Sequence, residues 1–118
     1  MSVKEFAFHP TGDTVLLASA TTAPTGVQVV SNDAQGANRS SDCYQFYNAG
    51  DETSYIGWGA TATSAQSATV VPTLGTAQGV VPVPAGAVIV FRFGLNMFFS
   101  GINATSAGDV FITPGEGV

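Results

Sequence analysis

Short apolar runs alternate with glycine, proline and small polar residues along the whole chain. The runs are rich in Val, Ile, Phe, Tyr and Thr, which favour strands, and glycine and proline recur too often for a long helix. The pattern therefore predicts many short β-strands and almost no helix. The expected strands cover residues 3–8, 14–18, 27–31, 43–48, 55–60, 79–83, 87–93, 97–102 and 109–113, with a further short piece at 69–72.

Turn signals and periodicity predict how some of these strands are used. Residues 43–48 alternate in side-chain type and end at a turn-like Asn-Ala-Gly-Asp, so we expect a hairpin with residues 55–60. Residues 87–93 are almost continuously apolar, which predicts a strand buried on both faces. The Ala/Thr/Ser/Gln stretch 61–68 is expected to be a long loop or a polar edge strand, and residues 32–41 an exposed loop.

The number and spacing of these strands predict the fold class. Eight or more short strands separated by turns are typical of an all-β domain, either an antiparallel β-sandwich or a small barrel. Jelly-roll and immunoglobulin-like topologies both fit. Pro82 and Pro84 cannot donate to a ladder, so that region is expected at an edge or a bend. With 118 residues, we expect one domain that spans residues 1–118.

Composition narrows the possible partners. Charged residues make up 9% of the chain and hydrophobic residues 45%, so neutral hydroxyl and amide groups supply most of the polarity, which suits wide protein contacts. The net charge is −5 with only Lys4, Arg39 and Arg92 as cations, which argues against nucleic acid and anionic membranes as partners. From the first ten residues we expect no signal peptide, and the lone Cys43 predicts no intrachain disulfide and synthesis in the cytosol.

Residues that could carry chemistry are few. His9 is the sole histidine and is expected to be structural, and Cys43 is expected to be a small buried hydrophobe. Asp51 and Glu52 could offer oxygens to calcium, but no calcium-loop pattern surrounds them. We therefore predict no catalytic residue, no metal site and no cofactor. A small hydrolase is kept as a third alternative, which would need a cleft with a carboxylate pair.

The aromatic residues allow two interpretations. Tyr44, Tyr47, Tyr55 and Trp58 fall on two strands expected to be neighbours, where they either fill the core and cover the sheet or form a face that stacks on sugars. The glycines on both sides of Trp58 predict that another backbone or a ring packs closely against that strand. The core is expected to hold Phe91, Phe93, Phe98, Phe99 and Phe111, although adjacent Phe98 and Phe99 must point to opposite faces, so one of them is a candidate contact with another subunit.

Three segments in the second half of the chain form a recognisable set. They are Tyr-Ile-Gly-Trp-Gly at 55–59, Val-Pro-Val-Pro-Ala-Gly-Ala-Val-Ile-Val-Phe at 81–91 and Val-Phe-Ile-Thr-Pro-Gly-Glu-Gly at 110–117. Together they resemble segments of small virion proteins of tailed bacteriophages. The resemblance implies a non-enzymatic structural protein, such as a decoration or cement protein on the outside of a capsid. Such proteins are often β-sandwiches that form dimers or trimers at lattice symmetry points.

Our leading hypothesis is therefore a capsid decoration protein that resides in the virion and bridges neighbouring copies of the major capsid protein or another virion protein. Residues 1–8 and 114–118 are expected to act as extended arms. The alternative is a glycan- or receptor-binding module of a tail or fibre, with Tyr55 and Trp58 as stacking residues. The predicted interface residues are Val3, Phe6, Phe8, Tyr55, Trp58, Phe98, Phe99 and Pro114.

Overall fold

Nine strands and one short helix make up the part of the chain that the structure, a computed structural model, describes, namely residues 8–31 and 42–116. The order along the chain is β1 (His9–Pro10), β2 (Val15–Ser19), β3 (Val27–Gln28), β4 (Cys43–Asn48), β5 (Ser54–Gly59), α1 (Ala62–Ala68), β6 (Val80–Val83), β7 (Val88–Arg92), β8 (Phe98–Asn103) and β9 (Gly108–Glu116). The expected strand at 69–72 is not present. Residues 9–10, expected in a turn, pair with β9 instead.

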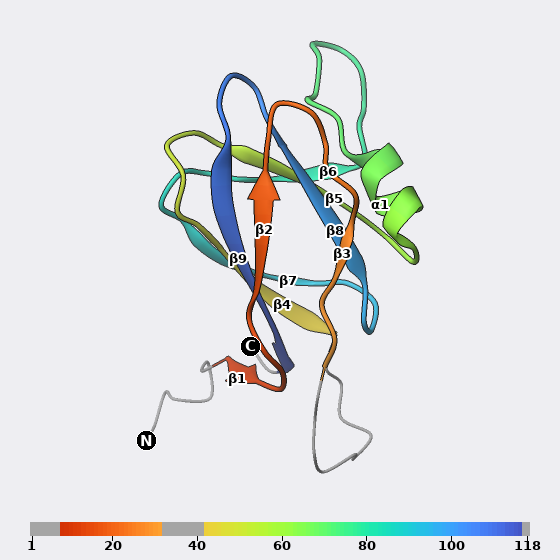
Figure 1. Ribbon diagram of the computed structural model, residues 1–118, viewed down its shortest axis with the longest axis vertical. Coiled ribbons are helices and arrows are strands. Elements are labelled where there is room, and N and C mark those ends of the chain that lie inside the picture. Colours follow the sequence, from red (N-terminus) through yellow and green to blue (C-terminus); the bar gives the residue numbers. More distant parts are fainter. Residues whose placement is uncertain (1–7, 32–41, 117–118) are drawn as a thin grey trace.

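The strands form two antiparallel sheets that pack face to face (Figure 1). We call them sheet A, in which β2 and β1 both pair with β9 and the order continues through β4 to β7, and sheet B, with the order β3-β8-β5-β6. Successive strands from β2 onward switch between the sheets, except β5 and β6. This order is that of a jelly roll, so the structure confirms the all-β sandwich and selects one of the two predicted topologies.

An aromatic cluster joins the two sheets. Phe99 of β8 is fully buried, with ring centroids 4.9 Å from Tyr44 and 5.3 Å from Phe46, both on β4 of the facing sheet. Phe93 lies 5.3 Å from Phe99 and 4.8 Å from Trp58. Edge-to-face pairs of this kind add to the free energy gained from burying the rings themselves. The core is completed by Leu17, Val29, Ile56, Val83, Val110 and Ile112.

The hairpin expected between residues 43–48 and 55–60 is wrong. β4 pairs with β7 and β9 in sheet A, whereas β5 pairs with β6 and β8 in sheet B. Asn48 explains why the connection crosses between the sheets. Its buried side chain donates to the carbonyl oxygens of Glu52 (2.9 Å) and Val83 (2.8 Å) and accepts from the amide of Gly50 (2.8 Å). These bonds hold the crossover and the end of β6 together.

Two further strand predictions need correction. β7 was expected to be buried on both faces, but it lies at the edge of sheet A, and Val88 is 58% exposed. Phe111 was expected in the core, but it alternates with buried Val110 and Ile112 and so points to the outer face of sheet A. An apolar run by itself does not distinguish burial by the facing sheet from exposure at an edge.

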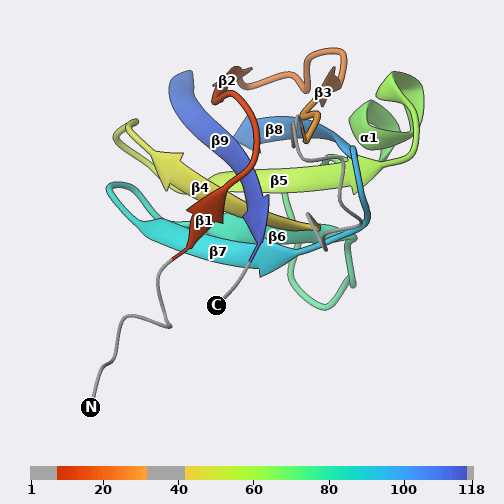
Figure 2. The ribbon, with the colours of Figure 1, turned by 90° about the horizontal axis from the view of Figure 1, so that it is seen from below.

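The stretch expected to be a loop or edge strand contains the helix α1. Thr61 is its N-cap, and a capping box joins Thr61 and Ser64 in both directions. The helix packs against β5 and β8 on the outer side of sheet B (Figures 1 and 2). This contact needs the glycines beside Trp58. A Cβ at Gly57 would collide with Thr69 Oγ1, and one at Gly59 would lie 2.8 Å from the Ala65 amide nitrogen. The predicted close packing is confirmed, and of the two alternatives it is a backbone, not a ring, that lies there.

Gly57→Ala is expected to lower the free energy of unfolding by about 2 kcal/mol, because the added methyl group forces the end of α1 away from the sheet. Urea denaturation of the purified variants measures this change. Gly79→Ala is the matched control, since no atom lies within 4 Å of a Cβ at that position. Equal stability of the two variants would show that α1 yields to the added methyl group without cost.

Candidate protein-interaction surface

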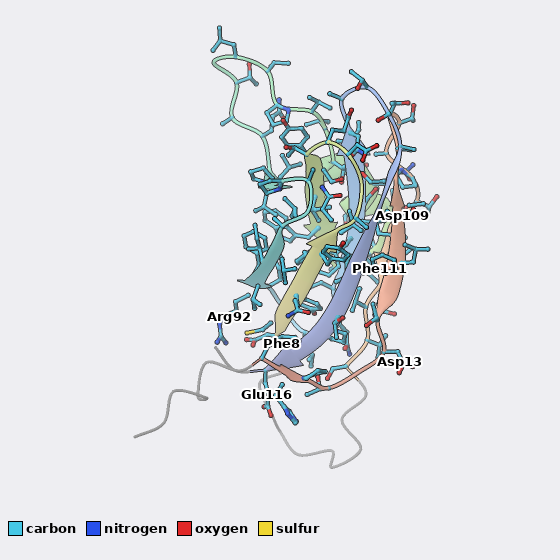
Figure 3. All side chains as sticks on the ribbon, turned by 90° about the vertical axis from the view of Figure 1, so that its left-hand side faces the viewer. Phe8, Asp13, Arg92, Asp109, Phe111 and Glu116 are labelled. Carbon is cyan, nitrogen blue, oxygen red and sulfur yellow. The ribbon has the colours of Figure 1, made fainter. Side chains whose placement is uncertain are left out.

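The outer faces of the two sheets differ. On sheet B, α1 and the segment before β3 cover the outer side of β5 and β8. Ser100 Oγ donates to the Pro24 carbonyl (2.7 Å), and Gly26 fits closely against Ala62 and Ala65. Within residues 8–31 and 42–116, no helix covers the outer face of sheet A, which Figure 3 shows toward the viewer. This face is therefore where a partner has access to a broad flat surface.

A row of four large apolar side chains crosses the outer face of sheet A, one from each of β2, β9, β4 and β7. The strand register places Leu16 opposite Phe111, Phe111 opposite Tyr47, and Tyr47 opposite Val88. Leu16 is 52% exposed, Tyr47 41% and Val88 58%, and Phe111 is half-buried between its neighbours. We call these four residues the apolar row.

The rings at the centre of the apolar row lie nearly parallel. The centroids of Tyr47 and Phe111 are 6.1 Å apart, with 15° between the ring planes. Because both residues belong to strands that are paired on each side, their backbone positions are fixed. A partner therefore meets a rigid aromatic surface, and little side-chain entropy is lost when it binds.

Polar and charged groups surround the apolar row. Toward one end, the hydroxyl oxygens of Thr14 and Thr113 lie 2.7 Å apart. Asp13 and Asp109 lie along the β2 side of the face, and Arg92 lies along the opposite side (Figure 3). Arg92 is held by Asp42 at 2.9 Å, so its charge is compensated. The β2 side of the face is thus acidic, whereas the β7 side carries a neutral ion pair.

Phe8 and Pro114, two of the predicted arm residues, belong to the fold. Phe8 packs over Gly115 on the outer face of sheet A, where a Cβ on Gly115 would collide with its ring. Pro114 is buried inside β9. The alternation of the ladder directs its missing N–H away from β4, toward the break between β1 and β2, and its carbonyl accepts from the Thr11 amide (2.9 Å). The expected arm at 114–116 is therefore wrong.

The other predicted interface residues do not gather in one place. Phe99 is in the core, while its neighbour Phe98 points outward and is half-buried. Tyr55 and Trp58 lie three positions apart on one strand and so face opposite sides of it, Trp58 inward against Phe93. They do not form a common stacking platform. Val3 and Phe6, with the rest of residues 1–7, lie outside the described residues, as do residues 32–41, where a loop was expected, and residues 117–118.

The titratable groups form no catalytic arrangement among the described residues. His9 Nε2 lies 4.0 Å from Glu116 Oε2, and the side chain of His9 is exposed to solvent. Cys43 is buried, and burial raises the pKa of its thiol. A groove of about 250 Å³ lies between β2 and β3. The described residues that line it are Asp13, Val15, Gln28 and Val30, and of these four only Asp13 is titratable.

Metal and membrane sites are also not seen in the described part of the chain. No group of three or more His, Cys, Asp and Glu side chains is placed to hold a metal ion. No helix there has the length and apolar character needed to cross a membrane. Glu52, one of the two candidate calcium ligands, is used differently, as its hydrogen bonds show.

Glu52 fastens two loops together at one end of the sandwich. Its carboxylate accepts from the Thr105 hydroxyl (2.5 Å) and amide (2.8 Å) and from the Ser106 hydroxyl (3.1 Å) and amide (3.4 Å). These bonds, led by that of the Thr105 hydroxyl, lower the pKa of Glu52 to about 2. Glu52 therefore ties the β4–β5 crossover to the β8–β9 connection, which also crosses between the sheets, and has a structural role.

Comparison with known proteins identifies no relative. No protein-family model matches the chain, and no curated protein and no solved structure matches it significantly. The geometry of the chain itself is therefore the basis for assigning a function.

Sequence reasoning missed the apolar row. Tyr47 was considered only together with Tyr55 and Trp58, and Leu16 and Val88 were not singled out. The alternation of residues 43–48 did place Tyr47 on the face opposite Tyr44 and Phe46, as the structure has it. The row itself depends on which strands are neighbours, and four segments far apart in the sequence contribute to it.

The Glu52 contacts predict a specific acid response. Because the pKa is lowered in the folded protein, the stabilisation by Glu52 is complete above the unfolded pKa near 4.5 and is lost as pH falls through about 2. We expect the difference in unfolding free energy between the wild type and Glu52→Gln to be constant near pH 7 and to shrink from pH 4.5 down to 2. Chemical denaturation across this range measures it.

Asp51→Asn is the matched control, since it removes a neighbouring carboxylate without touching the bonds to Thr105 and Ser106. A gap between the wild type and Glu52→Gln that stays constant down to pH 2 would contradict the assigned role of Glu52.

Proposed function

We propose that this protein is a non-enzymatic structural component of a virion, a capsid decoration protein that binds the assembled shell through the apolar row. The observation that carries the binding role is the row itself, four large apolar side chains in register on an uncovered, rigid sheet face. Exposed apolar patches with polar surroundings are typical of protein-interaction sites. The assignment to a virion comes from the resemblance of residues 55–59, 81–91 and 110–117 to phage virion proteins.

The chemistry of the face favours a protein surface as the occupant. Aromatic residues at the centre of an interface supply much of its binding energy. The hydroxyl groups of Thr14 and Thr113 beside the row are neutral, so they cost less to desolvate than charged groups when a partner docks. Asp13 and Asp109 at the β2 side add a charge preference. The matching part of the shell would carry an apolar centre with Lys or Arg beside it.

A jelly roll by itself does not choose between the two hypotheses, since the fold occurs in viral capsid proteins and in lectins. The exposed ring of Tyr47 is the one feature that a sugar could use in the same way, because a pyranose stacks on an aromatic plane. The row extends beyond the two rings to aliphatic Leu16 and Val88, and a small hydrophilic sugar makes no use of them. We therefore favour protein binding and treat sugar binding as an outcome of the test.

The proposal predicts that the protein cosediments with shells assembled from the major capsid protein encoded in the same genome. Tyr47→Ser and Phe111→Ser should each weaken this binding by about 30-fold, the equivalent of a central aromatic anchor worth about 2 kcal/mol. Leu74→Ser is the matched control, because Leu74 is fully exposed on a loop away from sheet A. Thermal melts of all three variants verify folding.

Three results would reject the proposal. The first is that the wild type does not cosediment with such shells. The second is that the Leu74→Ser control weakens binding as much as the row variants do. The third is that a glycan array shows a sugar bound through Tyr47 while the protein has no affinity for shells. The last result would assign the face to the glycan-binding alternative.

A further inference from the structure

β7 forms an edge of sheet A, and within residues 8–31 and 42–116 no strand pairs with its outer side. It also lacks the features that protect the other edge strands. β6, at the edge of sheet B, contains Pro82, and β3 has only two residues. β1 contains Pro10, and β2 is followed by a bridge from Ala20 to Ile102 that links it to the other sheet. β7 reads Val-Ile-Val-Phe-Arg, with no proline or glycine, and among the described strands it pairs with β4 alone. Edges of this kind readily accept another strand.

The ladder shows which backbone groups are unpaired. The Phe93 amide donates to the Asp42 carbonyl (2.8 Å), and the Ala87 carbonyl accepts from the Asn48 amide (3.1 Å). Odd-numbered residues of β7 therefore bond to β4. By the alternation of an antiparallel ladder, Val88, Val90 and Arg92 direct their N–H and C=O groups outward.

We propose that β7 pairs antiparallel with β7 of a second copy of this chain, on a twofold axis at Val90, so that two copies of sheet A become one continuous sheet. In this register Val90 faces Val90 of the other copy, and Val88 faces Arg92. It is the one symmetric register in which all three outward-facing residues of each strand find partners. A register centred on Arg92 would oppose two guanidinium groups and is disfavoured.

Charge favours a second copy at this edge. The chain carries a net charge of −5, so two copies repel one another unless they meet where charge is compensated. At the β7 side, Arg92 is paired with Asp42. The unpaired carboxylates of Asp13 and Asp109 lie on the far side of the sheet (Figure 3). The dimer would thus join the neutral sides and keep the acidic sides apart.

This inference does not depend on the proposed function, although the dimer would carry two apolar rows on one continuous face. A partner with repeated binding sites could then be held by both rows together. Because dimerisation is measured on purified protein without shells, its failure is distinguishable from failure of shell binding.

Sedimentation velocity of the full chain, from about 5 to about 500 μM, tests the dimer in the range expected for a small interface. The wild type should shift from monomer to dimer as its concentration rises. Val90→Pro removes an outward N–H without breaking the bonds to β4, and Val90→Lys opposes two ammonium groups on the axis. Each should weaken the dimer at least tenfold. Leu16→Lys, the same kind of change at an exposed position on β2, should leave it unchanged.

Cysteine pairs test the register. In a Cys43→Ser background, Val90→Cys should form an intermolecular disulfide on mild oxidation, because directly opposed residues of a bonded pair lie about 5.5 Å apart between Cα atoms. Val88→Cys should not, because the two positions are offset along the strands by about 13 Å. A wild type that stays monomeric at every concentration, a dimer that survives both changes at Val90, or crosslinking at position 88 in place of 90 would overturn the proposal.

Discussion

The contact of Phe99 with Tyr44 and Phe46 is the interaction on which the rest of the structure depends. It brings a ring from sheet B between two rings of sheet A, and each sheet thereby buries one face. Tyr44 contributes twice, because its hydroxyl also donates to the Gly94 carbonyl (2.5 Å) and accepts from the Met97 amide (3.1 Å). The cluster therefore positions the β7–β8 connection as well as the sheets.

The outer faces follow from this inward packing. Once Tyr44 and Phe46 point inward, Tyr47 must point outward, and the same alternation exposes Phe111 on β9 and Val88 on β7. On the outer side of sheet B the strands carry Gly57, Gly59 and Ser100, whose small size lets α1 and the segment before β3 lie close to the strands. Sheet A keeps large apolar side chains there instead. The contrast between the two faces is what gives the molecule a binding side.

Hydrogen bonds of polar side chains join segments that are far apart in the sequence. Asn48 holds the crossover between the sheets, and Ser19 and Ser54 both donate to Asn103 Oδ1, at 2.8 and 2.6 Å. Glu52 uses its charge for four hydrogen bonds from Thr105 and Ser106. Asp42 is paired with Arg92, and Asp13 and Asp109 lie on the opposite side of sheet A, so the β7 side carries little net charge. A low charge content is thus compatible with both a stable fold and a surface ready for contact.

The sequence by itself determined the class of fold and most of its strands, because alternation of apolar and polar residues is a local property that each segment carries. It also indicated that another part of the chain would lie close against Gly57 and Gly59, and the structure shows that this part is the backbone of Ser64–Ala65 and Thr69. Only the tertiary structure decided that residues 43–48 and 55–60 lie in different sheets, that β7 is an edge, and that Leu16, Phe111, Tyr47 and Val88 form one row. These features depend on which strands become neighbours, and strand neighbours are chosen by packing and by bonds such as those of Asn48 between segments far apart in the chain. Local pattern does not encode that choice, because an apolar strand satisfies its own periodicity equally well in the centre of a sheet or at its edge.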